Sequence, residues 1–136
     1  MKSLLFGGVR LGSAVGDFGV LVLRVFMGLS VSLAHGWDKV PPAEGFTKGV
    51  QSLGFPAEAA YLTMLTEFVG GLLLAAGLAT RPVALAMCIN FGVAGFLFHA
   101  NDPYLRKELA LLLLAAAVMF VCMGAGRFSV DRLLKK

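Results

Sequence analysis

Apolar residues lie in four long runs along the chain, and each run ends at polar or helix-breaking residues. The runs cover roughly residues 18–36, 58–79, 82–99 and 107–124. A helix of about 20 residues spans the roughly 30 Å of hydrocarbon in a bilayer, so each run is close to the length of one membrane crossing. The pattern predicts an all-α integral membrane protein whose four helices form an antiparallel bundle.

The segments between the runs predict how the helices are connected. A tight turn at "ATRPVAL" joins the second and third runs, because Pro82 suits the first turn of a helix, where its missing N–H would be unpaired anyway. The one long connection covers residues 37 to about 57. Its central "FTKGVQSL" predicts a short interfacial helix between the first two crossings. Residues 1–136 then form a single transmembrane domain.

Composition agrees with a membrane location. Of the 136 residues, 58% are AVILMFWYC and only 15% are charged, which is far more apolar than an ordinary soluble domain. No cleavable signal peptide is expected, because the apolar patch before Arg10 is short. The net charge of +4 comes from residues scattered at the ends of the runs, which argues against nucleic-acid binding. Membrane lipids are the expected surroundings.

The basic residues predict how the chain is oriented. If the runs alternate in direction, one side of the membrane carries Lys2, Arg10, Arg81, Arg127, Arg132, Lys135 and Lys136. The other side carries Lys39, Lys48, Arg106 and Lys107. Lys and Arg are enriched on the cytoplasmic side, so seven residues against four place both termini in the cytoplasm. We expect a multi-pass protein of the inner (plasma) membrane.

Small residues in the first two runs predict close helix packing. They are Gly28, Ser32 and Gly36 in the first run, and Gly70, Gly71 and Gly77 in the second. Small side chains let two membrane helices approach closely. Packing is therefore their expected role.

Two charged residues lie inside the runs, where each costs at least about 2.5–3.5 kcal/mol near the bilayer centre without a partner. Arg24 and Glu67 are expected to meet as an ion pair between the first two helices, in either a structural or a functional role. At about 100° per residue, Arg24 and His35 differ by only about 20° around their helix and share its inward face. Asn90 is expected to bond to a neighbouring helix.

Further polar residues cluster at the ends of the runs on the outer side. His35 ends the first run, His99 ends the third and Glu108 begins the fourth, with Trp37 and Asp38 nearby. Histidine changes charge near neutral pH, so this cluster predicts hydrogen bonding to a ligand or proton exchange. Amphipathic rings also gather at the headgroup level, and a role as interfacial anchor is the alternative, above all for Trp37.

Cysteine and histidine spacing argues against a metal site. Cys88 and Cys122 stand singly in apolar runs with no CxxC, which is typical of packed thiols. Two histidines on different helices define no recognisable coordination spacing. Haem ligation by His35 and His99 is geometrically conceivable and disfavoured. No metal is expected.

Three ordered pieces of the chain, "LRVFMGLSVSLAHGWDKV", "LTEFVGGLLLAAGLATRPVAL" and "ELALLLLAAAVMFVCMGAGRFSVDRLL", resemble the DoxX family of small four-helix membrane proteins. The resemblance runs from about residue 21 to residue 134. It implies an antiparallel four-helix bundle and membership in redox or sulfur-linked membrane assemblies, since one namesake is the small subunit of a thiosulfate:quinone oxidoreductase. Related bundles serve as receptor chaperones or cargo receptors, so the resemblance implies the fold more firmly than the chemistry.

These observations lead to one principal functional hypothesis and two alternatives. We expect a small subunit of a redox, oxidative-stress or sulfur-linked oxidoreductase assembly that binds a quinone or similar lipophilic molecule in a polar cleft. The predicted catalytic residues are Glu67, Arg24 and His35, and the predicted ligand-binding residues are His99, Glu108, Trp37 and Asp38. No nucleotide-binding motif is present, so a bound or partner-supplied cofactor would carry any electron transfer.

The first alternative is a non-catalytic anchor or assembly factor. It would recruit soluble oxidoreductases on the cytoplasmic side, and its polar core would serve packing specificity. The second alternative is a small proton-coupled transporter, which the absence of an inverted repeat disfavours. A homo-oligomer is compatible with all three hypotheses.

Overall fold

A computed structural model describes residues 12–134, and within that range every regular element is a helix. Ser13 begins the first helix, α2 (Ala14–Ser30), by accepting a hydrogen bond from the Gly16 N–H at 3.0 Å, as helix-capping serines do. The helix continues without interruption through a π-helical segment η1 (Val31–Gly36) and a 3₁₀ turn η2 (Trp37–Lys39). The first predicted run therefore forms one continuous helical rod.

The remaining helices are α3 (Glu44–Ser52), α4 (Glu58–Ala76), α5 (Thr80–Val93) with its π-helical extension η3 (Ala94–Phe98), α6 (Tyr104–Met123) and α7 (Val130–Leu133). All of them lie close to predicted segments except α7, which was not predicted. Gly77 ends α4 at φ 71°, in the left-handed region that a glycine adopts without steric cost. The short helix predicted in the long connection is α3.

Three of the described helices are long and apolar enough to cross a membrane. They are Ala14–Lys39, Glu58–Ala76 and Thr80–Phe98. Helix α6 has 20 residues, but its first turns carry Arg106, Lys107 and Glu108. The described part of the chain is thus an all-helical protein with three candidate membrane-spanning helices.

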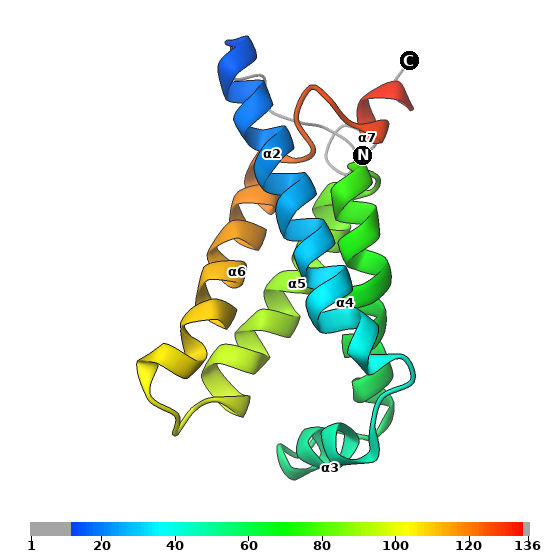
Figure 1. Cartoon of the computed structure of the whole chain (residues 1–136), viewed down its shortest axis with the longest axis vertical. Coiled ribbons are helices and arrows are strands. Elements are labelled where there is room, and N and C mark those ends of the chain that lie inside the picture. Colours follow the sequence, from blue (N-terminus) through cyan, green and yellow to red (C-terminus); the bar gives the residue numbers. More distant parts are fainter. Residues whose placement is uncertain (1–11, 135–136) are drawn as a thin grey trace.

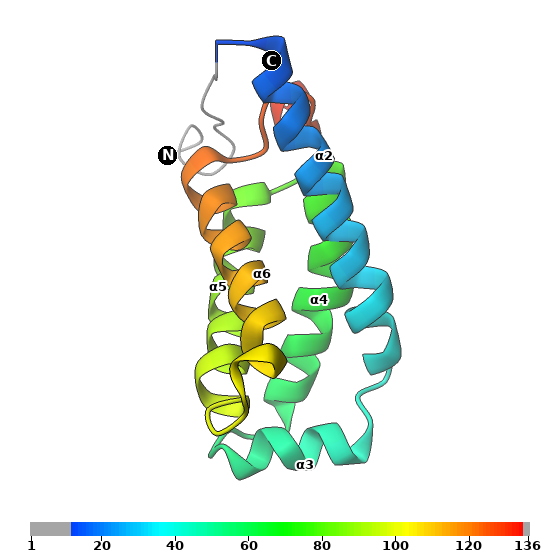
Figure 2. The same cartoon turned by 60° about the vertical axis from the view of Figure 1, so that its left-hand side comes forward.

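The long helices form two side-by-side pairs that meet at one end of the molecule and diverge toward the other (Figures 1 and 2). One pair consists of α2 with η1 packed on α4, and the other of α5 packed on α6. Helix α7 lies at the end where α2 begins, and α3 lies across the opposite end. We call these the α7 end and the α3 end.

Buried apolar side chains join the two pairs in the half of the molecule nearer the α7 end. They include Met27 and Val31 from the first rod, Leu74 from α4, Met87 from α5 and Phe120 from α6. Each of these residues is 0–3% exposed. This core holds the pairs together at one end and leaves their other ends apart.

Glycines set the contact between the first rod and α4, as the small residues predicted. A Cβ atom on Gly28 would lie 2.5 Å from the Gly71 carbonyl oxygen, and one on Gly36 would lie 2.5 Å from the Phe68 nitrogen. Ser32 Oγ donates to the Phe68 carbonyl at 2.9 Å. Gly70 takes no part in this contact, because a Cβ on it would face Val83 of α5. Gly77 ends α4 and leaves room for Arg24 of α2, whose guanidinium a Cβ on Gly77 would overlap.

This register shows that the predicted Arg24–Glu67 ion pair is wrong. Gly36 packs against the backbone of Glu67 and Phe68, so Glu67 lies level with Gly36. Arg24 is twelve residues earlier, which at 1.5 Å per residue is about 18 Å along the helix axis. The prediction placed both helix ends at one level, whereas α4 begins at Glu58 and extends beyond the first rod at the α3 end (Figure 1).

Arg24 instead fastens the C-terminal segment at the α7 end. Its Nη2 donates to the Phe128 carbonyl at 2.6 Å. Asp131 accepts hydrogen bonds from the backbone N–H groups of Ala79 at 2.7 Å and Thr80 at 2.9 Å, and so caps α5. Arg24 and Asp131 are each 1% exposed. Residues 128–131 are therefore part of the packed structure at this end.

Candidate ligand-binding cavity

A cavity of about 640 Å³ occupies the space between the two helix pairs near the α3 end. Its walls come from α4, from α5 with η3, and from α6, and α3 contributes Phe46 and Val50 at its end. Most of the other lining side chains are apolar, among them Leu62, Ile89, Phe91, Phe98, Leu109 and Leu113. The volume falls within the range of about 300–1,000 Å³ that is typical of small-molecule sites.

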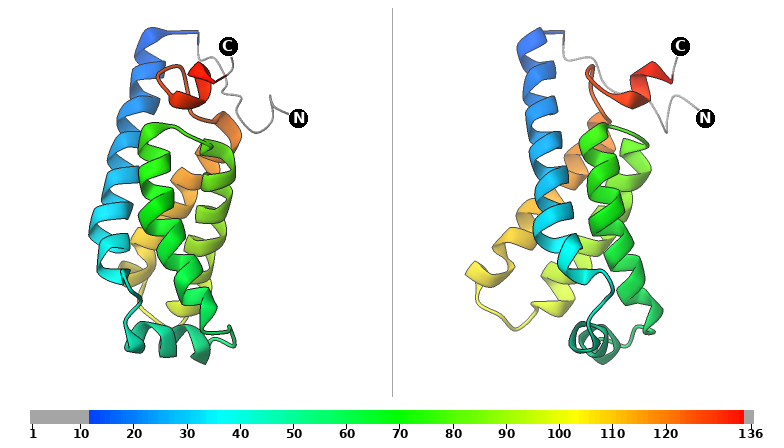
Figure 3. Two further views of the ribbon diagram at one scale, coloured as in Figure 1. Left: turned by 90° about the vertical axis from the view of Figure 1, so that its right-hand side faces the viewer. Right: turned by 45° about the vertical axis from the view of Figure 1, so that its right-hand side comes forward.

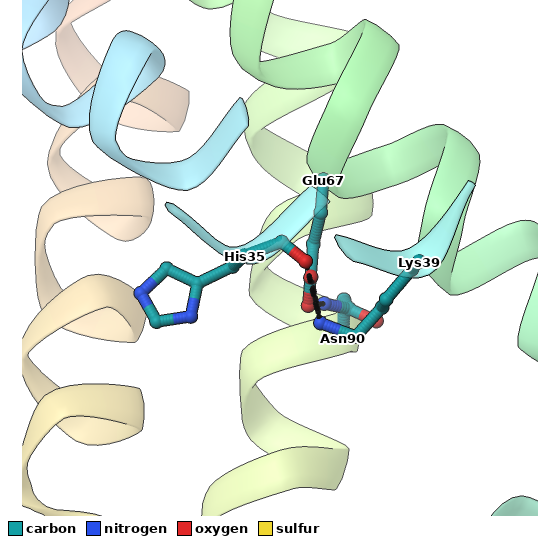
Figure 4. A network of polar contacts seen from close by, with 4 residues as sticks. All are labelled: His35, Lys39, Glu67 and Asn90. Carbon is teal, nitrogen blue, oxygen red and sulfur yellow. Dashed lines mark hydrogen bonds and ion pairs between the residues drawn. The ribbon is translucent and has the colours of Figure 1, made fainter. Parts of the chain in front are cut away.

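Three polar side chains meet in one wall of this cavity (Figure 4). Lys39 Nζ lies 2.5 Å from Glu67 Oε2, and Asn90 Nδ2 donates to Glu67 Oε1 at 2.9 Å. Lys39 Nζ also donates to the His35 carbonyl at 3.0 Å. Both oxygens of the Glu67 carboxylate are therefore satisfied, by partners from two other helices. The expectation that Asn90 bonds to a neighbouring helix is confirmed.

The local fold explains how a carboxylate is tolerated here. The Glu67 side chain is 8% exposed and that of Lys39 is 21% exposed, so the pair lies largely out of water. An isolated charge at such a place costs several kcal/mol, and an opposite charge within hydrogen-bonding distance offsets much of that cost. Lys39 Nζ also lies 5.3 Å from the centre of the Phe46 ring, which connects α3 to the ion pair through a cation–π contact.

Two of the predicted outer residues line the same cavity as Glu67. His35 contributes to the lining, although its ring points away from the Glu67 carboxylate (Figure 4). His99 lines the cavity from the end of η3, and its Nδ1 lies 2.7 Å from Asp102 Oδ2. The structure therefore brings Glu67, His35 and His99 to one cavity, with separate hydrogen-bond partners.

The other four predicted site residues do not line the cavity. Arg24 lies at the α7 end. Trp37 is 63% exposed and packs edge-on against Phe68, with ring centres 5.7 Å apart. Asp38 and Glu108 lie at the level of the cavity but outside its lining, because successive residues of a helix point in different directions.

The charge at Asp102 responds to its neighbours. A hydrogen bond from His99 lowers the pKa of the Asp102 carboxyl below its ordinary value, and the positive charges of Arg106 and Lys107 act in the same direction. Asp102 lies in the connection between η3 and α6, outside the candidate spans. Among residues 12–134, no three His, Cys, Asp or Glu side chains are placed to hold a metal ion.

Lys39 is the functional candidate that sequence reasoning missed. The sequence pattern placed it among the basic residues that predict orientation, yet it neutralises the carboxylate in the cavity wall. The sequence did contain one signal for this role. Gly36 is a small residue that allows close helix packing, and Lys39 follows it by three positions, which is close to one helical turn and places both residues on the same face. Any residue on α4 that packs against Gly36 is thus within reach of the Lys39 side chain.

Together, the apolar helices and the cavity define a helical membrane protein with room for a small molecule between its helices. Comparison with known families agrees: the DoxX family model matches residues 19–100, and the chain belongs to the DoxX family. It is 32% identical to the inner membrane protein YqjF of Escherichia coli strain K12 over 124 residues, which are 88% of this chain and 95% of that protein.

A second relative comes from Bacillus subtilis strain 168 and bears the name "Putative oxidoreductase CatD". It is 29% identical over 116 residues, which are 85% of this chain and 86% of that protein. No solved structure matches the chain. The comparisons therefore agree with the membrane location that the helices indicate, and a relative's name points toward redox chemistry.

Proposed function

We propose that this protein is a small inner-membrane subunit of an oxidoreductase assembly and that it binds a quinone, or a similar lipophilic ring compound, in the cavity beside Glu67. The observation that carries the proposal is an apolar cavity with one polar wall, built from Lys39, Glu67 and Asn90. The names of the two relatives support the membrane and the redox parts of the proposal.

The proposal includes four membrane crossings in an antiparallel bundle. Helix α6 is the fourth: its 20 residues correspond to about 30 Å, and it packs along α5. Helix α3 is proposed to lie in the interface, because Phe46 and Val50 face the cavity. Its polar side chains Glu44 and Lys48 pair with each other on the exposed surface at 2.6 Å.

The proposed orientation places the α7 end in the cytoplasm. Arg81, Arg127 and Arg132 lie at or beside the α7 end, whereas Lys48, Arg106 and Lys107 lie at the α3 end. Lys39 adds little to the second group, because Glu67 neutralises it. The remaining basic residues of the cytoplasmic count, Lys2, Arg10, Lys135 and Lys136, lie outside the described residues. The described residues alone give three basic side chains at each end, so the proposed orientation rests on the count over the full sequence, seven against four.

The polar wall suits a carbonyl-bearing ring. Lys39 and the Asn90 amide carry N–H donors at the cavity wall, and aromatic side chains such as Phe91 and Phe98 offer flat apolar surface. Reduction of a quinone to a quinol takes up two electrons and two protons. A partner protein would supply the electrons. This chain would bind and orient the ring, with the Lys39 ammonium as the donor of one proton and water as the source of the other.

Binding tests this proposal directly. The protein is purified in a mild detergent and titrated with decylubiquinone, with binding followed by native mass spectrometry and thermal shift. We expect Glu67→Gln to weaken binding about tenfold, which corresponds to roughly 1.4 kcal/mol, because it removes the charge that holds Lys39 in place. Glu58→Gln is the matched control, since Glu58 is exposed on the same helix and lies outside the cavity. Wild-type protein without affinity for the probe would contradict the proposal.

A second function, recruitment of a soluble oxidoreductase, is favoured by one observation. Leu133 and Leu134 are 67% and 65% exposed at the α7 end beside the basic Arg132, while Asp131 ties the segment to the bundle. The double substitution Leu133→Ser and Leu134→Ser keeps Asp131 and removes the apolar surface. Loss of a co-purifying soluble oxidoreductase, with decylubiquinone binding unchanged, would favour recruitment over the cavity as the main function.

A further inference from the structure

The cavity reaches the outer surface of the protein between α4 and α5. Leu62 of α4 is 64% exposed and Ile89 of α5 is 65% exposed, yet both line the same cavity as the buried Glu67 and Phe91. The cavity therefore runs from the apolar surface of the two helices to the interior. In the proposed membrane placement, that surface faces hydrocarbon.

The packing of α4 and α5 explains why the opening lies where it does. Toward the α7 end the two helices touch, since a Cβ on Gly70 would lie 3.5 Å from Val83 and 3.6 Å from Met87. Toward the α3 end they diverge (Figure 3). The hydrogen bond from Asn90 to Glu67 joins the helices at the point where they separate. Polar groups thus lie at the inner edge of an otherwise apolar opening.

We propose that the ligand is an amphiphile that enters sideways from the bilayer through this opening between α4 and α5. It consists of a small ring bearing a carbonyl or hydroxyl group and a long alkyl or prenyl tail. The ring reaches Glu67 and Asn90, and the tail lies past Leu62 and Ile89 into the surrounding lipid. This inference rests on the proposed function and adds the class of ligand and its route.

Solvation explains why such a ligand would use this route. A tail that stays among apolar side chains and lipid loses no favourable surroundings, because lipid is as apolar as leucine. A ring carbonyl in hydrocarbon lacks hydrogen-bond donors, and it gains them on reaching the wall that holds Asn90. At the α3 end, α3 lies across the molecule and lines the cavity with the apolar side chains of Phe46 and Val50.

A competing exit lies on the side of α6, where Leu109 lines the cavity and is 50% exposed. The α4–α5 side differs because both of its walls carry an exposed apolar residue, Leu62 and Ile89. The two exits are distinguished by filling each in turn with a tryptophan.

The experiment compares two probes in lipid nanodiscs: decylubiquinone, and 2,3-dimethoxy-5-methyl-1,4-benzoquinone, which is the same ring without the tail. The variants are Leu62→Trp and Ile89→Trp, each measured alone. Their matched controls are Leu72→Trp on α4 and Leu85→Trp on α5, which are also exposed but lie outside the cavity. Leu109→Trp fills the competing exit. All five positions are exposed, so an added indole has room.

We expect Leu62→Trp and Ile89→Trp to raise the Kd for decylubiquinone about tenfold or more, and to change the Kd for the tailless ring less than about twofold. The controls should leave both values unchanged. The lateral route would be overturned by a selective loss of decylubiquinone binding in Leu109→Trp, or by unchanged binding in both Leu62→Trp and Ile89→Trp. Either result would leave the binding function intact. Wild-type protein that binds neither probe would overturn the binding function itself, and this inference with it.

Discussion

Removing one partner of the Lys39–Glu67 ion pair is expected to destabilise the fold unequally. Lys39→Met leaves the Glu67 carboxylate, on a side chain that is 8% exposed, with Asn90 as its remaining partner. Glu67→Gln leaves an ammonium that is 21% exposed and keeps its bond to the His35 carbonyl. The stranded carboxylate is the more buried group, so Lys39→Met should be the more damaging change.

The magnitude follows from the burial of the two groups. Breaking a fully buried ion pair costs about 3–5 kcal/mol, and the partial exposure of Lys39 together with the surviving Asn90 bond reduces this to about 2–3 kcal/mol for Lys39→Met. For Glu67→Gln, about 1 kcal/mol is expected, the usual value for a lost hydrogen bond. The double variant should be more stable than Lys39→Met alone, because it no longer contains the stranded charge.

The assay is equilibrium unfolding in mixed micelles, in which the mole fraction of a denaturing detergent is raised and helix content is followed by circular dichroism. Lys48→Met is the matched control, because it breaks the Glu44–Lys48 pair, whose side chains are 81% and 70% exposed. Exposed helix pairs contribute about 0.3–0.5 kcal/mol. The reasoning would be refuted if Lys39→Met were no more destabilising than Lys48→Met.

Three further predictions concern other parts of the fold. Asp131→Ala should lower the free energy of unfolding by about 2 kcal/mol, because two backbone N–H groups lose their acceptor, whereas Asp38→Ala should change it little in the same titration. Gly36→Leu should prevent folding or shift the unfolding midpoint strongly, since its Cβ would overlap Phe68, while Gly45→Leu has open space. Asp102→Asn should lower the free energy of unfolding above about pH 4, where the carboxyl of the wild-type protein is ionised. In acid-unfolding curves the difference between the two proteins should disappear as the pH falls through the lowered pKa of Asp102, because only the ionised carboxyl stabilises the fold.

The helices were largely predictable because their signals are local. The four apolar runs differ from the observed helices by only a few residues at each end, and α4 begins at Glu58 as predicted. The glycines of the first run pack closely against α4 as their size suggested. The π-helical segments η1 and η3 were not predicted, since nothing in an apolar run distinguishes a π-turn from an α-turn.

The contents of the cavity wall were predictable only in part. His35 and His99 were expected at one level because each ends its run, and Glu67 was expected deeper in the same cleft; all three line the cavity. The partner of Glu67 was assigned to Arg24 because both residues lie inside their runs. The structure gives that role to Lys39, since it lies where α4 passes the end of the first rod.

What the sequence by itself determined is a chain of membrane-length apolar helices, a short amphipathic helix between the first two, and a few polar residues that must find partners. These properties depend on neighbours along the chain. Only the tertiary structure decided which polar residues meet. The contact of Gly36 with Phe68 sets the register of two helices, and each residue of displacement moves a side chain by 1.5 Å and 100°. For that reason Glu67 meets Lys39, while Arg24 lies about a dozen residues away and holds the C-terminal segment.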